Sequence, residues 1–303
     1  MKKPAFIITQ TILSIFLAAS VGAVGALVYD LKTDSLHIDK FNPFAASDSS
    51  KKNEPKKVQE TSKQESSQKS EVQESSVQES STVETIKLRE EPADLQSQPQ
   101  ELIDMLKRYG YKIDYNVSGD HLIVVDTSKS TAKIYLYQKS KSGYWWNVIG
   151  DNEPITEKGY IGEKGSSFVI SEGSEQTPGG IWWMGKAFYT DDKPNSTYSM
   201  FQITEDTYWV TDSNSKFYNQ RVEGTEEKDW TSAEHMITMS KQYKYGIVIN
   251  YNTSPAKAGA GSAIFMHCGD SPTAGCVAVP ENVMKTIIEW LDENSVANIF
   301  ITV

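Results

Sequence analysis

Cysteine and histidine are scarce in this chain, and basic residues are fewer than acidic ones. Among 303 residues there are two cysteines and four histidines, and the formal net charge is −10. An excess of negative charge does not suit binding to a phosphate backbone, so we exclude nucleic acid as a partner. No Cys-x-x-Cys or His-x-x-x-His spacing occurs, which disfavours a zinc site built from His267, Cys268, Asp270 and Cys276. The sequence indicates no metal and no organic cofactor.

Large apolar and aromatic side chains are nearly absent between Ser47 and Thr85. This stretch consists mostly of Ser, Glu, Gln and Lys. It cannot bury enough apolar area to offset an ordering entropy of about 1–2 kcal/mol per residue. We therefore predict a disordered linker over residues 30–92, which gives the domain that follows it reach.

Charged residues are also missing from Pro4 to Tyr29, a stretch rich in Ile, Leu, Val and Ala that follows two lysines. Its length approaches the roughly 20 apolar residues that span a bilayer, and the lysines hold the N-terminus in the cytoplasm. We predict a signal-anchor or transmembrane helix over residues 1–29, which binds the membrane and leaves the rest of the chain outside the cytoplasm. The alternative is secretion after cleavage at Ala23, because the preceding residues form an acceptable cleavage pattern.

The remaining sequence has the patterns of a mainly β domain. An amphipathic helix is expected from Pro99 to Arg108, and a second one from Pro280 to Glu293. We divide this part into a short helical lead-in, residues 93–120, and a domain, residues 121–303, for which we predict a β-sandwich with the C-terminal helix packed near the loop described next. Runs rich in β-branched and aromatic residues predict strands at 121–126, 132–137, 144–149, 168–170, 181–189, 245–251, 261–268 and 298–303.

The ten residues 267–276 bring a base and a nucleophile into one short loop. A thiol is mostly protonated at neutral pH, and a nearby imidazole raises its thiolate fraction. Strand alternation puts His267 and Cys268 on opposite faces, so Cys268 points into packing. Cys276 instead follows a turn of small residues that ends at Gly275, where backbone N–H groups can face an incoming carbonyl. We predict Cys276 as the nucleophile, His267 as its base and Cys268 as a buried, inert thiol.

Several of these segments together resemble a known family. The segments are Thr177-Pro178-Gly179-Gly180, the strand that ends at His267, the turn Thr273-Ala274-Gly275-Cys276 and the helix behind it. In this order and strand context they resemble the YkuD-type L,D-transpeptidase catalytic domain, over roughly Leu122 to Val303.

The resemblance implies a β-sandwich of the YkuD type that cross-links peptidoglycan stem peptides at the cell wall. It implies that Cys276 attacks the carbonyl of the third stem residue and expels D-alanine, and that an amine of a neighbouring stem resolves the thioester. Carried over residue by residue, His267 accepts and returns the proton, Gly275 faces the oxyanion and Thr273 takes the family's Ser/Thr position. The same resemblance assigns Thr177, Pro178 and Gly180 to substrate binding.

Other functions remain open on the sequence. Water in place of the amine would make the protein an L,D-carboxypeptidase, and a merely structural thiol would make it a non-catalytic module that binds the cell wall. A sortase also has His before Cys, but its chemistry needs an Arg downstream of the nucleophile, and none occurs between Val277 and Val303.

Overall fold

A computed structural model describes residues 85–303. The predicted transmembrane helix and most of the predicted linker lie outside the described residues. Within residues 85–303, no helix is both long and apolar enough to cross a bilayer.

The described chain is mainly β, as predicted. Its helices are α1 (Gln100–Arg108), α2 (Ile113–Asn116), α3 (Glu281–Trp290) and the 3-10 turns η1 (Met236–Met239) and η2 (Gln242–Lys244). The strands are β1 (His121–Ser128), β2 (Thr131–Lys139), β3 (Trp145–Asn147), β4 (Thr156–Tyr160), β5 (Ser166–Ser167), β6 (Thr177–Pro178), β7 (Gly180–Tyr189), β8 (Met200–Gln202), β9 (Thr207–Val210), β10 (Arg221–Glu223), β11 (Ala233–His235), β12 (Tyr245–Ile249), β13 (Phe265–Cys268), β14 (Val277–Val279) and β15 (Ala297–Ile301).

One large sheet organises the domain. Its strands follow the order β1-β15-β7-β12-β13-β14-β4-β2-β3, with β8 paired to β7, and a further β1–β2 ladder joins the two sides. The strands that we expected in a sandwich are therefore hydrogen-bonded into a single sheet that closes on itself. Closure arises because β1 pairs with β2 next to it in sequence and also with β15 at the end of the chain.

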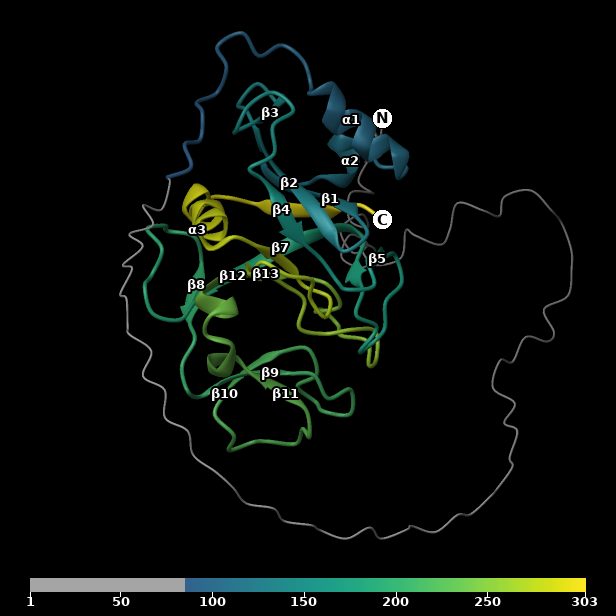
Figure 1. Cartoon of the computed structure of the whole chain (residues 1–303), viewed down its shortest axis with the longest axis vertical. Helices are drawn as coiled ribbons and strands as arrows, with labels where there is room; N and C mark the ends of the chain where they lie inside the picture. The colour runs from purple at the N-terminus through teal and green to yellow at the C-terminus, as the bar shows by residue number, and fades with distance from the viewer. Residues whose placement is uncertain (1–84) are drawn as a thin grey trace, which may run out of the picture. The chain divides into compact units, whose positions relative to one another are not determined.

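A separate three-stranded sheet, β10-β9-β11, packs at one end of the domain. In Figure 1 this sheet lies at the bottom, opposite α1 and α2. The sequence predicts no element between Tyr189 and Tyr245, so this sheet was not expected. We call β9, β10, β11 and the loops between them, residues 204–235, the cap sheet.

Apolar clusters fill both faces of β13. On one face, Met266 and Cys268 join the main core, which also holds the buried side of α3. On the other face, Phe265 belongs to a second cluster with Trp209 of the cap sheet and Tyr243 of η2. A third cluster lies under α1, which is amphipathic as predicted and buries Leu102, Met105 and Leu106.

Most expected elements are present with shifted ends, and two segments differ. Residues 168–170, predicted as a strand, have no strand hydrogen bonding, and Phe168 and Val169 are exposed. Residues 85–92 close the predicted linker yet lie along the domain. Ile86 and Leu88 pack against the main core there, and the Arg89 N–H donates to the Val148 carbonyl at 2.8 Å. The few apolar residues of this segment thus hold residues 85–92 against the domain.

Candidate active site

Strand β13 separates the two cysteines, as its alternation predicted. Ile264, Met266 and Cys268 belong to the main core, whereas Ala263 and Phe265 belong to the second cluster. The Cys268 thiol donates to the Tyr245 carbonyl at 3.5 Å, and burial raises its pKa to about 12. Both cysteines are free. Because the two sulfurs lie on opposite faces, they cannot serve as ligands of one metal or form a disulfide without rearrangement of the strand.

Cys276 packs against the second cluster, just before β14 begins. Its sulfur lies between two backbone groups: the thiol donates to the Ala263 carbonyl at 3.3 Å and accepts from the Phe265 N–H at 3.4 Å. Burial first, and then the charge of Glu234, raise the pKa of this thiol to about 12, against the lowering effect of the bond from Phe265. In the resting site Cys276 is a protonated thiol, and the Phe265 N–H already lies where it would donate a hydrogen bond to the thiolate.

His267 is 7% exposed, and its imidazole is fixed by one backbone bond. Its Nδ1 lies 2.8 Å from the Cys268 carbonyl oxygen, which can only accept, so Nδ1 carries the proton. Nε2 of the neutral ring is then a proton acceptor. Burial lowers the pKa of His267, and the hydrogen bond to Cys268 partly offsets this. The sequence led us to expect that the imidazole raises the thiolate fraction, but burial favours the neutral form of both groups.

The strand register places His267 and Cys276 on the same face. Strands β13 and β14 run parallel, with His267 opposite Ala278 and Met266 opposite Val277. Cys276 therefore lies two residues before the partner of His267, and side chains two residues apart on a strand share a face. Extended by one residue, the register thus places the predicted base and nucleophile at diagonal positions of one face.

Only eight residues, 269–276, connect these parallel strands. Parallel strands usually need a connection of about a dozen residues or more, because the chain must return to the same end of the sheet. The return is guided by a third segment: the Thr273 N–H donates to the Ile161 carbonyl at 3.0 Å, and the Thr273 carbonyl accepts from Glu163 N–H at 2.9 Å. The loop that carries the nucleophile is thus docked on residues 161–163.

Thr273 and Gly275 shape the backbone at the nucleophile. The Thr273 hydroxyl donates to the Cys276 carbonyl at 2.7 Å and accepts from the Gly275 N–H at 3.1 Å. Gly275 has φ +149°, and a Cβ there would lie 3.0 Å from the Gln176 carbonyl oxygen. Glycine is therefore required at this turn. The role of Gly275 as an oxyanion donor stays a prediction, which requires its bond to Thr273 to open.

The residues assigned to substrate binding, Thr177, Pro178 and Gly180, are all buried. Thr177 is 0% exposed, and its hydroxyl donates to the Cys276 carbonyl at 3.3 Å while accepting from Gly162 N–H at 2.8 Å. Thr177, distant from Cys276 in sequence, thus supports the same carbonyl of the nucleophile as Thr273. Direct contact of these three residues with a substrate stays a prediction.

Sequence reasoning missed the pair Tyr243 and Glu234. The Tyr243 ring meets that of His267 edge-on, with centroids 5.5 Å apart, and its hydroxyl donates to the Glu234 carboxylate. Burial raises the pKa of Glu234, and the charge of Glu172 adds to this. No sequence signal links these residues to the thiol, because they come from η2 and the cap sheet.

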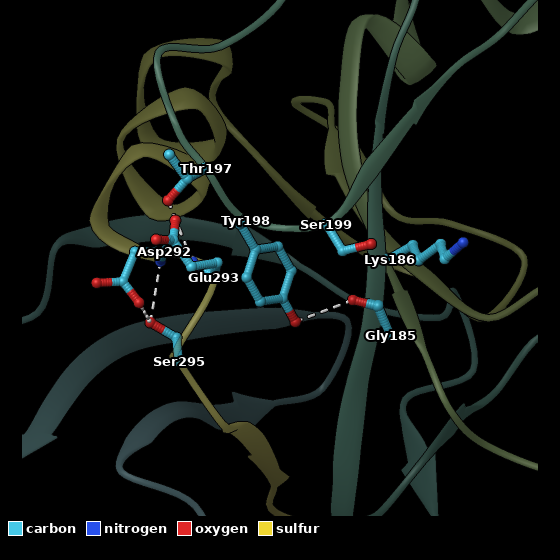
Figure 2. Close-up of a pocket in the computed structure, with 8 residues that line it drawn as sticks. All are labelled: Gly185, Lys186, Thr197, Tyr198, Ser199, Asp292, Glu293 and Ser295. Carbon is cyan, nitrogen blue, oxygen red and sulfur yellow. Dashed lines mark hydrogen bonds between the residues drawn. The ribbon is translucent and has the colours of Figure 1, made fainter.

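The cavity shown in Figure 2 lies elsewhere in the domain. It has a volume of about 400 Å³ and is lined by Gly185, Lys186, Thr197, Tyr198, Ser199, Asp292, Glu293 and Ser295. None of the predicted catalytic residues lines it. Several of its polar groups bind each other: the Tyr198 hydroxyl donates to the Gly185 carbonyl at 3.0 Å, and the Ser295 hydroxyl donates to Asp292 at 3.0 Å. The predicted catalytic residues therefore lie outside this cavity, and we place the candidate active site at Cys276.

Comparison with known proteins gives one match. A family model described as the YkuD L,D-transpeptidase catalytic domain matches residues 120–299. No curated protein and no solved structure matches the chain significantly. The matched segment contains β1 to β14, α3 and both His267 and Cys276.

Proposed function

The chain belongs to the YkuD family of L,D-transpeptidase catalytic domains, and from this premise we propose that it forms cross-links in peptidoglycan by acyl transfer through Cys276. Proteins of this family act on peptidoglycan stem peptides. We propose the stem peptide as the substrate, with the third residue as acyl donor. The predicted export signal supports a location outside the cytoplasm, anchored in the cell membrane and facing the wall.

The first half of the reaction forms a thioester. Nε2 of His267 takes the proton of Cys276 as the sulfur attacks the carbonyl carbon of the third stem residue. When the tetrahedral intermediate collapses, the bond to the terminal D-alanine breaks and the imidazolium gives its proton to the leaving amine. The Phe265 N–H, 3.4 Å from the sulfur, stabilises the developing thiolate.

The second half transfers the acyl group to an amine. The amine of a neighbouring stem attacks the thioester carbon, His267 accepts the amine proton and returns it to the departing sulfur, and the thiol is restored. A neutral imidazole suits both steps, because it must accept a proton before it donates one.

The single observation that carries the proposal is the shared face of His267 and Cys276. The register of β13 and β14 puts the two groups on the face away from the main core, while Cys268 is sealed within that core. A merely structural thiol would need neither the bond from Nδ1 that leaves Nε2 free nor an N–H aimed at its sulfur.

The proposal is tested by incubating the protein with a disaccharide-tetrapeptide and analysing the products by mass spectrometry. We expect a cross-linked dimer between two third residues, with loss of one D-alanine. Cys276→Ala should form no product, whereas Cys268→Ala, the matched control, should retain the activity. A tripeptide as the sole product would show that water, and not an amine, accepts the acyl group. Unchanged substrate would overturn the proposal.

A further inference from the structure

Asn219, in the loop between β9 and β10 of the cap sheet, is a buried amide with every hydrogen-bonding position occupied. It is 3% exposed and has φ +56°. Its Oδ1 accepts from the Trp209 indole N–H at 2.9 Å and from the Ala263 N–H at 3.0 Å. Its Nδ2 donates to the carbonyls of Tyr251 at 3.1 Å and Asn252 at 2.8 Å. An amide has two acceptor and two donor positions, so none is left over.

The bond to Ala263 reaches a strained position next to the nucleophile. Ala263 has φ +53°, in the left-handed region that side chains with a Cβ rarely adopt, and it is 6% exposed. Such a conformation persists only where surrounding contacts hold it. This residue also supplies the carbonyl that accepts from the Cys276 thiol, and the Phe265 N–H that contacts the same sulfur follows two residues later.

We propose that Asn219 is a positioning residue for Cys276: by holding Ala263 in the left-handed conformation, it fixes the Ala263 carbonyl and the Phe265 N–H that orient the sulfur toward His267. The inference rests on the proposed function, because it concerns the same thiol. It gives the cap sheet a part in the reaction, because Asn219 acts on the sulfur through Ala263 without bonding to the sulfur itself.

The test compares Asn219→Ala with Asn147→Ala in the full chain. Asn147 is a matched control: it is 2% exposed, and its amide makes three hydrogen bonds, but it lies on β3, at the far end of the sheet order from β13. Both variants should lower the melting temperature. A misplacement of about 1 Å costs up to roughly 100-fold in rate, so Asn219→Ala should lower kcat by tens of fold with KM little changed, and Asn147→Ala should leave kcat as it is.

Alkylation of Cys276 by iodoacetamide, followed at the peptide level, provides a readout without substrate. Looser packing around the sulfur should raise the rate at which Cys276 of Asn219→Ala is alkylated at pH 7, while kcat falls. An unchanged alkylation rate and kcat, with only the melting temperature lowered as in Asn147→Ala, would overturn the positioning role. Because alkylation needs no stem peptide, a wild-type protein that forms no product would refute the proposed function and leave this inference testable.

Two further variants identify Ala263 as the link. Glycine adopts a positive φ at little cost, so Ala263→Gly in the Asn219→Ala background should recover part of the lost kcat. Equal kcat in the single and double variants would overturn the proposal. Asn219→Gly removes the same amide and adopts the positive φ of residue 219 without strain, so it should lower kcat as Asn219→Ala does and keeps the test usable if the alanine variant does not fold.

Discussion

At the scale of single residues, the site holds its two reacting groups in neutral forms. Burial raises the pKa of Cys276 and lowers that of His267, so the imidazole can accept a proton and the thiol still has one to give. In the proposed reaction, proton transfer then accompanies the attack on the carbonyl instead of preceding it. A thiol that stays protonated in the absence of substrate is also less exposed to oxidation, which would suit the location outside the cytosol that we propose.

Burial disfavours the charged form of the Glu234 carboxyl group, so replacing this residue should have a pH-dependent effect on stability. Burial raises its folded pKa above the ordinary value of 4.5. The stability that it contributes is therefore present below about pH 4.5 and is lost as the pH rises through the folded pKa. Glu234→Gln keeps an acceptor for the Tyr243 hydroxyl and lacks this loss. The melting temperature of Glu234→Gln minus that of the wild type should increase from pH 4 to pH 8, as measured by differential scanning calorimetry.

The matched control for Glu234→Gln is Glu226→Gln, at an exposed position of the same cap sheet. Its difference from the wild type should vary little between pH 4 and pH 8. A flat difference for Glu234→Gln as well would show that the carboxyl is not destabilised in the folded protein.

Gly275→Ala tests the turn at the nucleophile against a second glycine with a positive φ elsewhere. A Cβ at Gly275 meets the Gln176 carbonyl oxygen, whereas Gly259, at φ +74°, has nothing within 4 Å of its Cβ position. The alanine at position 259 carries the left-handed penalty of roughly 1–2 kcal/mol, and Gly275, at φ +149°, lies outside the left-handed α region. Only Gly275→Ala should also lose most of its kcat, measured in the disaccharide-tetrapeptide assay. Equal retention of kcat would show that the backbone at Cys276 tolerates the shift.

At the scale of elements, the sequence predicted what depends on periodicity. The alternation along residues 263–268 correctly separated Cys268 from His267, because each face of β13 is buried against a different cluster. The stripe of α3 and the buried side of α1 were found for the same reason. The cap sheet was missed because its strands, β9 to β11, have three or four residues each, too few to show a period.

The site could be predicted only as far as its groups are neighbours in sequence. His267, Cys276 and Gly275 lie within one loop, and residue types at that spacing indicate their chemistry. Asn219 reaches Ala263 across 44 residues of sequence, and Thr177 reaches Cys276 across 99. Such contacts depend on how the strands pair, and nothing in a local pattern reveals them.

Helix α1 should contribute to stability without taking part in the reaction. Leu106 is 0% exposed in the cluster under α1, so Leu106→Ala removes buried methyl groups and leaves a cavity at a cost of about 2–5 kcal/mol. Urea denaturation should show this loss, while kcat under folding conditions stays unchanged. Tyr115→Ala, at a side chain that is 80% exposed, is the control and should change neither quantity. A large drop in kcat for Leu106→Ala would show that α1 acts on the site.

At the scale of the whole molecule, closure of the sheet makes the C-terminal strand essential. All five residues of β15 are buried, and the strand pairs with β1 on one side and β7 on the other. Deletion of residues 297–303 would leave two ladders of backbone groups without partners. We expect the truncated chain to lack a cooperative thermal transition by circular dichroism. A truncated chain that still unfolds cooperatively would show that the ring is not needed for folding.

The docking of Thr273 on residues 161–163 limits how this chemistry can be transplanted. Residues 265–279 contain the base, the nucleophile and both strands that carry them, and so look like a portable unit. Grafted into another β protein, they would lack residues 161–163, which bind the short loop through Thr273, and Thr177, whose hydroxyl donates to the Cys276 carbonyl. An engineer who wants the reaction in a new scaffold would therefore have to move residues 265–279, residues 161–163 and Thr177 together.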